Sequence, residues 1–248
     1  MEVMLVSIIT PTHNSIEFID ETYQSILAQT LDNWEWVVTD DASTDGTYEW
    51  LLEKAQMDIR IRVYRNSCNS GAGATRNRSI LESKGRFIAF LDADDLWLPN
   101  KLKTQITFMC KNNVLLSYTS YQKFDVTGDG GIVIPPSSVT YKELLHSNVI
   151  GCLTAIYDTK YLGKRYMPLI RKRQDMGLWL DILKNIKHAK GMNTCLAKYR
   201  TDSGMTSNKL TVLKYQWDFY RTVVGLSLPQ TILNFALYAY KGYIKQKI

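Results

Sequence analysis

Three carboxylates within four residues, Asp92, Asp94 and Asp95, directly follow an apolar run at residues 87–91. A buried strand can deliver such a cluster to the carboxyl edge of a sheet, where open α/β folds bind their ligands. Ionised carboxylates this close repel one another and are costly to desolvate without a counter-charge. A cation such as Mg²⁺ or Mn²⁺, shared with a substrate phosphate, would relieve both effects. The alternative is a solvated turn in which Asp95 caps a helix near Pro99, and the triplet alone does not decide.

Two further polar clusters are expected at the same edge of the sheet. Asp40 and Asp41 end a second apolar run, and Arg76 follows a stretch of small residues. Acids and bases that converge on one edge suit a metal-bound diphosphate. Gly71 and Gly73 resemble half of a dinucleotide-binding fingerprint, but Arg76 stands where the third glycine is required. This departure argues against a Rossmann oxidoreductase.

Strands and helices that alternate must position these clusters. Apolar patterns predict strands at residues 4–10, 34–39, 59–63 and 87–91, the first of them stopped by Pro11. Helical spacing predicts helices at residues 19–29 and 48–55, and a third that runs through Ile80. Three such alternations within about ninety residues argue for right-handed crossovers and a mostly parallel sheet.

The middle of the chain departs from this alternation. Pro99 is expected in the first turn of a further helix, and residues 115–121 form another apolar run. Residues 123–134 suggest a hairpin with a loose glycine-rich loop at residues 128–131. We therefore expect a second half that builds a different site.

Residues 160–173 carry six cations and no acid, namely Lys160, Lys164, Arg165, Arg171, Lys172 and Arg173. A solvated loop explains such a stretch, and a landing surface for phosphate or anionic lipid headgroups is the functional alternative. Helical spacing after this stretch places Asp175 at a helix N-terminus. Capping alone would explain an acid there.

The chain from about residue 210 onward is rich in aromatic and apolar residues, with cations at Lys241, Lys245 and Lys247. We expect a helical tail that packs on the main body. An amphipathic helix lying on a membrane surface is the alternative.

Composition limits the class of protein. A chain of 248 residues can bury a substantial core, and a net charge of +6 suits anionic partners such as nucleotides, nucleic acid or acidic lipids without selecting one. The four cysteines lie far apart without a C-x-x-C pair, which argues against zinc ligation and favours a reduced, cytosolic setting. The sequence predicts neither a signal peptide nor a bilayer-spanning segment.

Four segments carry a resemblance to a known family. The segments V-S-I-I-T-P-T-H-N at residues 6–14, D-D-A-S-T-D-G-T at residues 40–47 and L-D-A-D-D at residues 91–95 are similar, in order and spacing, to successive signatures of family 2 glycosyltransferases. The segment R-Q-D-M-G-L-W-L at residues 173–180 resembles the family's Glu-Asp-x-x-Leu-Trp-Leu segment, with Gln174 in place of the usual Glu.

The resemblance covers roughly residues 3–205 and implies a GT-A fold, an α/β architecture with a mostly parallel central sheet flanked by helices. It implies a nucleotide-sugar half at about residues 1–98, an acceptor half at about 99–205 and a helical C-terminal extension at 206–248. The segment L-A-K-Y-R at residues 196–200, with Trp217 and Tyr220-Arg221 beyond it, looks like bacterial members that build O-antigen, capsule or teichuronic-type polymers.

Site residues follow from the resemblance. It implies that a UDP-sugar donor is bound by Pro11, Thr12, Asn14, Asp40, Asp41, Arg76, Asp92, Asp94 and Arg200. Within this set Asp41 would accept a hydrogen bond from uracil N3–H, with Asp40 supporting the turn, and Asp92 would hold the ribose hydroxyls. A Mn²⁺ or Mg²⁺ ion that bridges the two phosphates would be bound by Asp94 and Asp95, whose ranking stays open.

The implied reaction is a single displacement with inversion. Asp175 would take the proton from the acceptor hydroxyl as it attacks the anomeric carbon, so an α-linked UDP-sugar gives a β-glycoside. The bacterial members imply a hexose, glucose or galactose, moved to a sugar hydroxyl of a polyprenyl-diphosphate-linked acceptor. They imply a peripheral enzyme on the cytoplasmic face of the plasma membrane with no nucleic-acid partner; the oligomeric state does not follow.

Two other functions stay open. A nucleotidyltransferase also uses a sheet-edge acidic pair with a metal, but P-T-H-N at residues 11–14 lacks the Gly-rich basic loop that usually follows its first strand. A non-catalytic nucleotide- or carbohydrate-binding relative would keep the same fold. The presence of Asp92, Asp94 and Asp175 argues against it.

Overall fold

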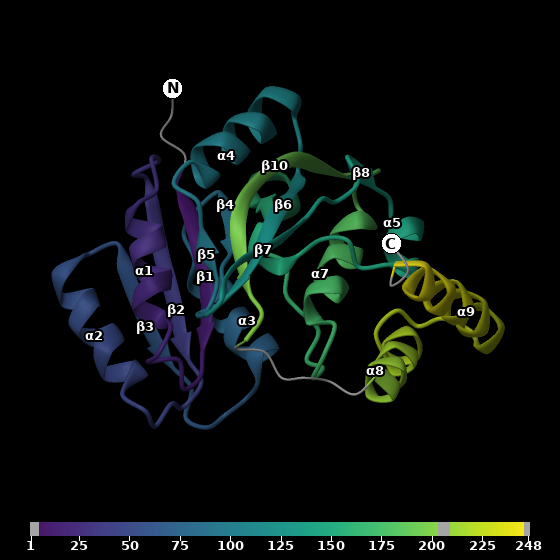
Figure 1. Ribbon diagram of the computed structural model, residues 1–248, viewed down its shortest axis with the longest axis horizontal. Coiled ribbons are helices and arrows are strands. Elements are labelled where there is room, and N and C mark those ends of the chain that lie inside the picture. Colours follow the sequence, from purple (N-terminus) through teal and green to yellow (C-terminus); the bar gives the residue numbers. More distant parts are fainter. Residues whose placement is uncertain (1–4, 203–208, 246–248) are drawn as a thin grey trace.

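The computed structural model describes residues 5–202 and 209–245. Among these residues one sheet of ten strands forms the centre of the molecule, in the order β3-β2-β1-β4-β9-β6-β10-β5, with β7 beside β6 and β8 beside β10 (Figure 1). Helices cover both faces of this sheet, and two C-terminal helices lie at the end opposite α1 and α2. The architecture is the α/β fold that the sequence predicts.

The N-terminal half alternates strand and helix as predicted. Its elements are β1 (Val6–Thr12), α1 (Ile19–Leu27), β2 (Trp34–Asp40), α2 (Thr47–Met57), β3 (Ile61–Arg65), α3 (Ala72–Glu82) and β4 (Phe87–Phe90). The pairs β1–β2, β1–β4 and β2–β3 are all parallel. Their carboxyl ends therefore meet at one edge, where the predicted polar clusters lie.

The prediction that Pro11 stops the first strand was wrong. Strand β1 continues through Pro11 to Thr12, and Pro11 lies opposite Thr39 of β2. On the other side of β1, pairing with β4 ends at Ile9 opposite Phe90. Proline lacks a backbone N–H, so it is tolerated where one neighbouring strand has already ended.

The second half builds a mixed extension of the sheet. Its elements are β5 (Leu96–Trp97), α4 (Lys101–Asn112), β6 (Leu116–Asp125), β7 (Gly128–Val133), β8 (Ser138–Val139), α5 (Tyr141–His146), a 3₁₀ turn (Cys152–Thr154), β9 (Ile156–Asp158), α6 (Thr159–Leu162), α7 (Gln174–Leu183) and β10 (Ala189–Arg200). Strand β9 is antiparallel to both β4 and β6, and β10 runs parallel to β6. Pro99 precedes α4 by two residues instead of lying in its first turn.

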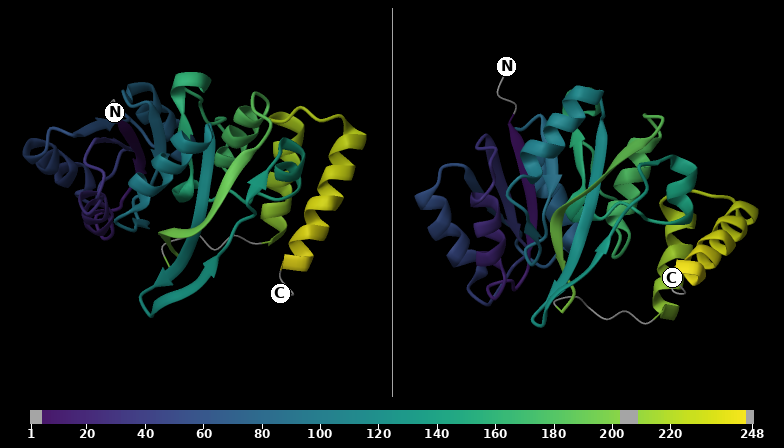
Figure 2. Two further views of the ribbon diagram at one scale, coloured as in Figure 1. Left: turned by 90° about the horizontal axis from the view of Figure 1, so that it is seen from above. Right: turned by 45° about the horizontal axis from the view of Figure 1, so that its top comes forward.

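The predicted hairpin is present, but its turn is shifted. Strands β6 and β7 pair antiparallel, with Asp125 opposite Gly128, so the chain reverses at residues 126–127. Residues 128–131, expected as the loop, belong to β7 itself. Figure 2 shows this hairpin extending beyond the rest of the sheet.

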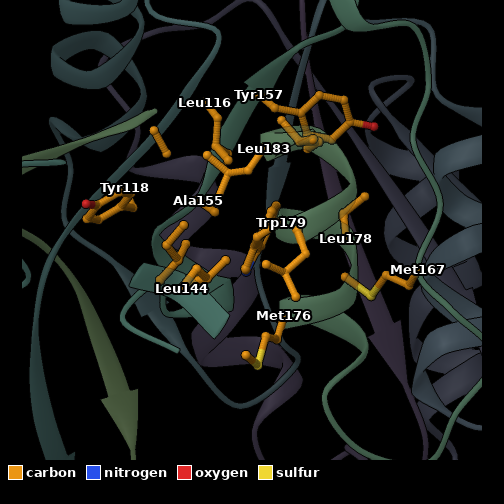
Figure 3. Packing of buried hydrophobic residues seen from close by; sticks show 14 of the residues in the cluster. Leu116, Tyr118, Leu144, Ala155, Tyr157, Met167, Met176, Leu178, Trp179 and Leu183 are labelled. Atoms are coloured by element: carbon orange, nitrogen blue, oxygen red, sulfur yellow. The ribbon is translucent and has the colours of Figure 1, made fainter. Parts of the chain in front are cut away.

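The core forms on both faces of the sheet because successive strand residues point to opposite sides. In β1, Ile8 packs with the cluster that includes Trp36 and Leu102, whereas Ile9 packs with the cluster around Trp179 of α7. Figure 3 shows Trp179 surrounded by aliphatic and aromatic side chains of the second half. Burial on both faces explains why these strands read as continuous apolar runs.

The C-terminal tail packs on the main body, as the first of the two expectations has it. Helix α8 (Lys209–Thr222) buries Phe219 and Tyr220 in the Trp179 cluster, and α9 (Leu228–Lys245) is joined to α5 by a hydrogen bond between His146 Nε2 and Asn234 Oδ1 (2.9 Å). No helix in the described ranges is both long and apolar enough to cross a membrane. Lys247 and the expected boundary at residue 205 lie outside the described residues.

A fully buried lysine gives the fold a pH-dependent contribution. Lys101 Nζ donates to Gln105 Oε1 (2.7 Å) and to the carbonyl oxygen of Thr154 (3.1 Å), and within residues 5–202 and 209–245 it forms no ion pair with an acid. Burial lowers its pKa to about 7. Between pH 7 and the ordinary lysine pKa near 10.5, the unfolded chain binds more protons at this site than the native protein does. The free energy of unfolding therefore rises with pH across that window.

We expect Lys101→Met to remove this rise. A side chain of similar length without charge avoids the cost of burying an ammonium ion, about 1.4 kcal/mol for each pKa unit. The variant should be more stable than the wild type at pH 7, and the difference should shrink by pH 10. Urea unfolding of both proteins at a series of pH values measures it. A difference that stays constant with pH would contradict the depressed lysine pKa.

Candidate active site

The loops that follow β1 and β2 are joined by hydrogen bonds at the carboxyl edge of the sheet. Asp41 N donates to the carbonyl oxygen of Thr12 (2.8 Å), Asn14 N donates to Ser43 Oγ (2.9 Å), and Thr44 N donates to Asn14 Oδ1 (2.9 Å). These bonds bring together three residues of the predicted donor-binding set. The sequence separates the two loops by about thirty residues.

Strained backbone marks the same region. Among the described residues, four non-glycine residues have positive φ, and three of them lie in the predicted site or beside it: Asn14 (50°) belongs to the donor-binding set, Ala42 (60°) follows Asp41, and Arg173 (71°) is two residues before Asp175. The fourth, Asn113, ends α4. Such conformations cost free energy and gather where function requires a special chain geometry.

Asp41 is a buried, ionised acceptor. Its Oδ1 accepts from Asn66 Nδ2 (2.7 Å) and Ser70 N (2.9 Å), and its Oδ2 accepts from Gly71 N (2.8 Å). Burial opposes ionisation, but these donors outweigh it and lower the pKa of Asp41. A carboxylate has about four acceptor positions, and these three N–H groups occupy three of them.

Asp40 lies behind Asp41 and holds the turn. Its side chain is fully buried; Oδ2 accepts from Ser43 N (3.1 Å) and pairs with Arg65 Nε (3.3 Å), while Oδ1 accepts from Thr12 Oγ1 (3.3 Å). This geometry supports the turn-holding role expected of Asp40. Direct contact between Asp40 and a UDP-sugar donor stays a prediction.

Local backbone geometry and packing explain why glycine stands at positions 71 and 73, without a bound dinucleotide. Gly71, with φ 83°, turns its N–H toward Asp41. A Cβ atom at Gly73 would lie 3.1 Å from Cγ of Gln174, so the absence of a side chain lets the start of α7 approach α3. The incomplete fingerprint is thus a packing feature that joins the two halves.

The three acids after β4 divide into two groups. Asp92 and Asp94 are partly exposed, whereas Asp95 is only 2% exposed and its Oδ1 accepts from Arg200 N (3.0 Å). Burial, together with the charges of Asp92 and Asp94, raises the pKa of Asp95 well above its usual value. Asn100 occupies the N-cap position of α4, so Asp95 does not cap that helix. This rules out the solvated, capped turn.

Arg200 stabilises the turn at residues 92–95, called the acidic turn below. It is 6% exposed; Nε donates to the carbonyl oxygen of Asp94 (2.9 Å) and NH2 donates to Glu21 Oε2 (2.6 Å), and the rings of Phe18 and Phe124 lie on it at 4.7 and 4.5 Å. Its contact with a donor stays a prediction, because the described contacts position the turn instead.

Arg76 of α3 holds Asp92 of the acidic turn. Its NH2 atom donates to Asp92 Oδ1 (2.5 Å), while its buried Nε has no partner in the described structure. Burial opposes its charge, but Asp92 and, more weakly, Asp175 raise its pKa. On the other side Asp175, in the first turn of α7, accepts at Oδ2 from Asn148 Nδ2 (2.9 Å).

Contacts of α3 bring the acidic turn and the start of α7 to the same region. Arg76 of α3 donates to Asp92, and Gly73 of the same helix packs against Gln174, the residue before Asp175. Both the acids that follow β4 and the acid of α7 therefore lie next to α3. The half-buried Cys152 belongs to the 3₁₀ turn; desolvation raises the pKa of its thiol, and the charge of Arg76 opposes the rise.

The acidic turn fits a divalent cation that a substrate helps to bind. No group of three or more His, Cys, Asp or Glu side chains in residues 5–202 and 209–245 could hold a metal unaided. Metals of the Mg²⁺ type are commonly held by one or two carboxylates together with substrate phosphates. Asp94 is partly exposed and suits this role better than the enclosed Asp95.

We expect Asn148→Ala to lower the kcat of a reaction that uses Asp175. Loss of a hydrogen bond to a charged group costs about 1.5–3 kcal/mol, which corresponds to about tenfold or more in rate if it misplaces the carboxylate. Steady-state kinetics should show a lower kcat with an unchanged KM for the donor. A selective loss of donor affinity would show instead that Asn148 serves the donor side.

Several supporting residues were missed by reasoning from the sequence. Asn66 holds Asp41, Asn148 holds Asp175, and Glu21 holds Arg200 across 179 positions of the chain. None of them belongs to a motif, and their partners are distant in sequence. Only the tertiary fold identifies them.

Comparisons with known proteins agree on one family. The family model described as "Glycosyl transferase family 2" matches residues 7–167. WfgD of Escherichia coli, named as a UDP-Glc:alpha-D-GlcNAc-diphosphoundecaprenol beta-1,3-glucosyltransferase, is 41% identical over 98% of this chain and 96% of its own. TuaG of Bacillus subtilis, whose name assigns it to teichuronic acid biosynthesis, is 39% identical over 98% of both chains.

Solved structures share the fold at lower identity. S. aureus TarS (residues 1–349) in complex with UDP-GlcNAc has a TM-score of 0.70 at 22% identity, over 95% of this chain and 72% of that one. The mannosyltransferase PcManGT from Pyrobaculum calidifontis, in complex with GDP-Man and Mn²⁺, has a TM-score of 0.64 at 15% identity, over 95% and 69%. These likenesses confirm the predicted GT-A architecture.

Proposed function

The chain belongs to glycosyltransferase family 2, and on that premise we propose that it transfers a hexose from a UDP-sugar to a sugar hydroxyl of a lipid-linked acceptor, with inversion. The observation that carries this proposal is the position of α3 between the acidic turn and α7: Arg76 donates to Asp92, and Gly73 packs against Gln174, the neighbour of Asp175. We propose that the acidic turn binds the donor and that Asp175, on the separate helix α7, is the base. A transferase needs this arrangement, because the acceptor must approach the face opposite the leaving group.

We assign the donor to the edge formed by β1, β2 and β4. Pro11, Thr12 and Asn14 border the base and ribose, and Asp41 accepts a hydrogen bond from uracil N3–H. Asp92, held by Arg76, takes the ribose hydroxyls. The UDP part of the donor is supported by the names of WfgD and of the TarS complex.

A Mn²⁺ or Mg²⁺ ion is proposed at Asp94, with Asp95 behind it. The crowded acids support it: burial and two neighbouring charges raise the pKa of Asp95, and a cation would relieve that repulsion. When bound, such an ion stabilises the charge that develops on the departing diphosphate. Arg200 keeps the turn in shape by its bonds to Asp94 and Asp95.

Asp175 is proposed as the general base. Asn148 orients its carboxylate, and the side chain is partly exposed at the start of α7. It would remove the proton from the acceptor hydroxyl while the oxygen attacks the anomeric carbon and the bond to UDP breaks. One displacement inverts the centre, so an α-linked donor gives a β-glycoside.

We propose for each part of the chain the function that the resemblance implies. We propose residues 1–98 as the nucleotide-sugar half, 99–205 as the acceptor half and 206–248 as an extension that supports the acceptor half. The exposed Leu228, Ile232 and Leu233 of α9 would suit contact with the cytoplasmic face of a membrane that holds a polyprenyl diphosphate acceptor.

A panel assay tests the function. The purified protein is incubated with UDP-glucose, UDP-galactose, UDP-GlcNAc or UDP-GalNAc and a GlcNAc- or GalNAc-diphosphate lipid, with and without Mn²⁺, and the products are weighed by mass spectrometry. We expect a metal-dependent mass increase of one hexose, with UDP-glucose as the first donor to test. Metal-dependent UDP binding without transfer to any acceptor would favour a non-catalytic relative.

A further inference from the structure

A hollow of about 460 Å³ lies beside Asp175, between the start of α7 and helix α8. Its walls are formed by Asn148, Arg171, Lys172, Arg173, Gln174, Asp175, Val212 and Tyr215. None of the proposed donor-binding residues belongs to this lining as described. The hollow is therefore a second binding region on the acceptor side of Asp175, with a volume in the range of small-molecule sites.

The cations of residues 160–173 form two groups, of which one lines this hollow and the other does not. Lys164 and Arg165 are engaged away from it, with the carbonyl oxygen of Leu81 and with Asp181. Arg171, Lys172 and Arg173 line it, and among the described residues no ion pair includes any of them. Three consecutive cations without an acidic partner make this wall attractive to an anionic ligand.

Aromatic side chains of the tail hold two of these cations at the wall. Lys172 Nζ lies 5.6 Å from the ring centroid of Tyr215 in α8, and Arg173 donates to the hydroxyl of Tyr238 in α9. Both helices of the C-terminal tail thus help to form this region.

Backbone geometry adds to the positive potential. Arg173 is the N-cap residue of α7, its φ of 71° is left-handed, and it makes no side-chain capping bond in the described structure. The first N–H groups and the positive end of the α7 dipole thus face this region, as at many phosphate sites.

A buried polar atom on the same wall has no partner. Asn148 Nδ2 is used by Asp175, but its buried Oδ1 accepts no hydrogen bond within the described part of the chain. Buried acceptors are nearly always satisfied by protein, water or ligand. A hydroxyl of the acceptor sugar, other than the one that Asp175 deprotonates, could donate a hydrogen bond to Asn148 Oδ1.

From these observations we infer that Arg171, Lys172 and Arg173 bind the diphosphate of the acceptor, and this inference rests on the proposed function. Because the diphosphate of the donor is assigned to the acidic turn, these three cations would bind a second diphosphate, that of the acceptor. Because Asp175 lines the same hollow, the attacked hydroxyl belongs to the sugar joined directly to the diphosphate. The substrate would then come from a reaction that transfers a sugar 1-phosphate from a nucleotide-sugar to a lipid phosphate and releases the nucleoside monophosphate.

The test removes two cations and compares two acceptors. Arg171→Gln/Lys172→Gln is measured against Lys160→Gln/Lys164→Gln, which removes two exposed cations of the same stretch outside the hollow. The acceptors are GlcNAc-diphosphate on a short alkyl chain and the matching alkyl glycoside without phosphate. We expect the first variant to raise KM for the diphosphate acceptor at least tenfold and to leave the alkyl glycoside and UDP affinity unchanged. The control should match the wild type.

Two results would overturn the assignment to the acceptor. If the first variant keeps the wild-type preference for the diphosphate acceptor, the cations do not bind it. If that KM is unchanged while binding to phosphatidylglycerol vesicles falls, the cations contact membrane headgroups instead.

Direct binding separates this inference from the proposed function. Calorimetry with the short-chain diphosphate acceptor should show binding by the wild type and at least tenfold weaker binding by the first variant. If this binding result is obtained but the wild type transfers no sugar, the proposed reaction is contradicted and the diphosphate site is still supported. Equal binding by both proteins would end the diphosphate site whatever the activity.

Discussion

Replacing Asp175 by Asn is expected to lower kcat for sugar transfer by about 10²–10⁴-fold, the range typical of a general base. Asparagine keeps the shape of the side chain but cannot accept the proton of the attacking hydroxyl. The donor edge lies on other elements, so UDP affinity should stay within about twofold of the wild-type value. Single-turnover transfer and calorimetric UDP titration measure the two quantities separately.

A matched control lies on the same helix. Asp181 is about two turns further along α7 and pairs with Arg165 at 3.4 Å, away from the acidic turn. Asp181→Asn removes the same charge from α7 and should leave kcat unchanged. If Asp175→Asn, correctly folded, retains wild-type transfer, Asp175 is not the base.

The second large effect is expected at the acidic turn. Asp94→Asn should weaken Mn²⁺-dependent UDP binding by on the order of 100-fold, because even the loss of a residue that supports a metal ligand costs 10–100-fold. Without metal, the variant and the wild type should bind UDP with similar, weak affinity. Calorimetry of UDP with and without Mn²⁺ gives both values.

Asp95→Asn is the informative comparison for this turn. Its side chain is enclosed, and Asn Oδ1 can still accept from Arg200 N. Since burial already raises the pKa of Asp95, removal of its charge should not reduce stability, and metal-dependent UDP binding should fall far less than in Asp94→Asn. The reverse order of effects would make Asp95 the ligand and Asp94 its support.

The sequence predicted most accurately the N-terminal half, in which strands and helices alternate along the chain. The apolar runs before Asp40 and Asp92 are buried on both faces, and parallel crossovers bring their ends to one edge whatever the details of the helices. The same logic failed at Pro11, because tolerance of proline depends on where the neighbouring β4 ends. It also misplaced the β6–β7 turn, since four glycine-rich residues lie within a strand.

The sequence could place candidate site residues at strand ends and at the start of α7, but it could not reveal the contacts that hold them. Asp41 and Asp92 follow from the pattern, but the donors that ionise Asp41 come from Asn66, Ser70 and Gly71, on the segment between β3 and α3. Asn148 is 27 positions from Asp175 and has no sequence signal. The ranking of Asp94 over Asp95 likewise needs burial, which two adjacent letters do not reveal.

The anomeric configuration of the product tests the central claim most directly. The purified enzyme is supplied with an α-linked UDP-hexose and a GlcNAc-diphosphate acceptor, and the new linkage is determined by proton NMR. A single displacement between the donor edge and Asp175 predicts a β-glycoside as the sole product. An α-linked product would show that the configuration is retained, and would contradict a one-step transfer with Asp175 as base.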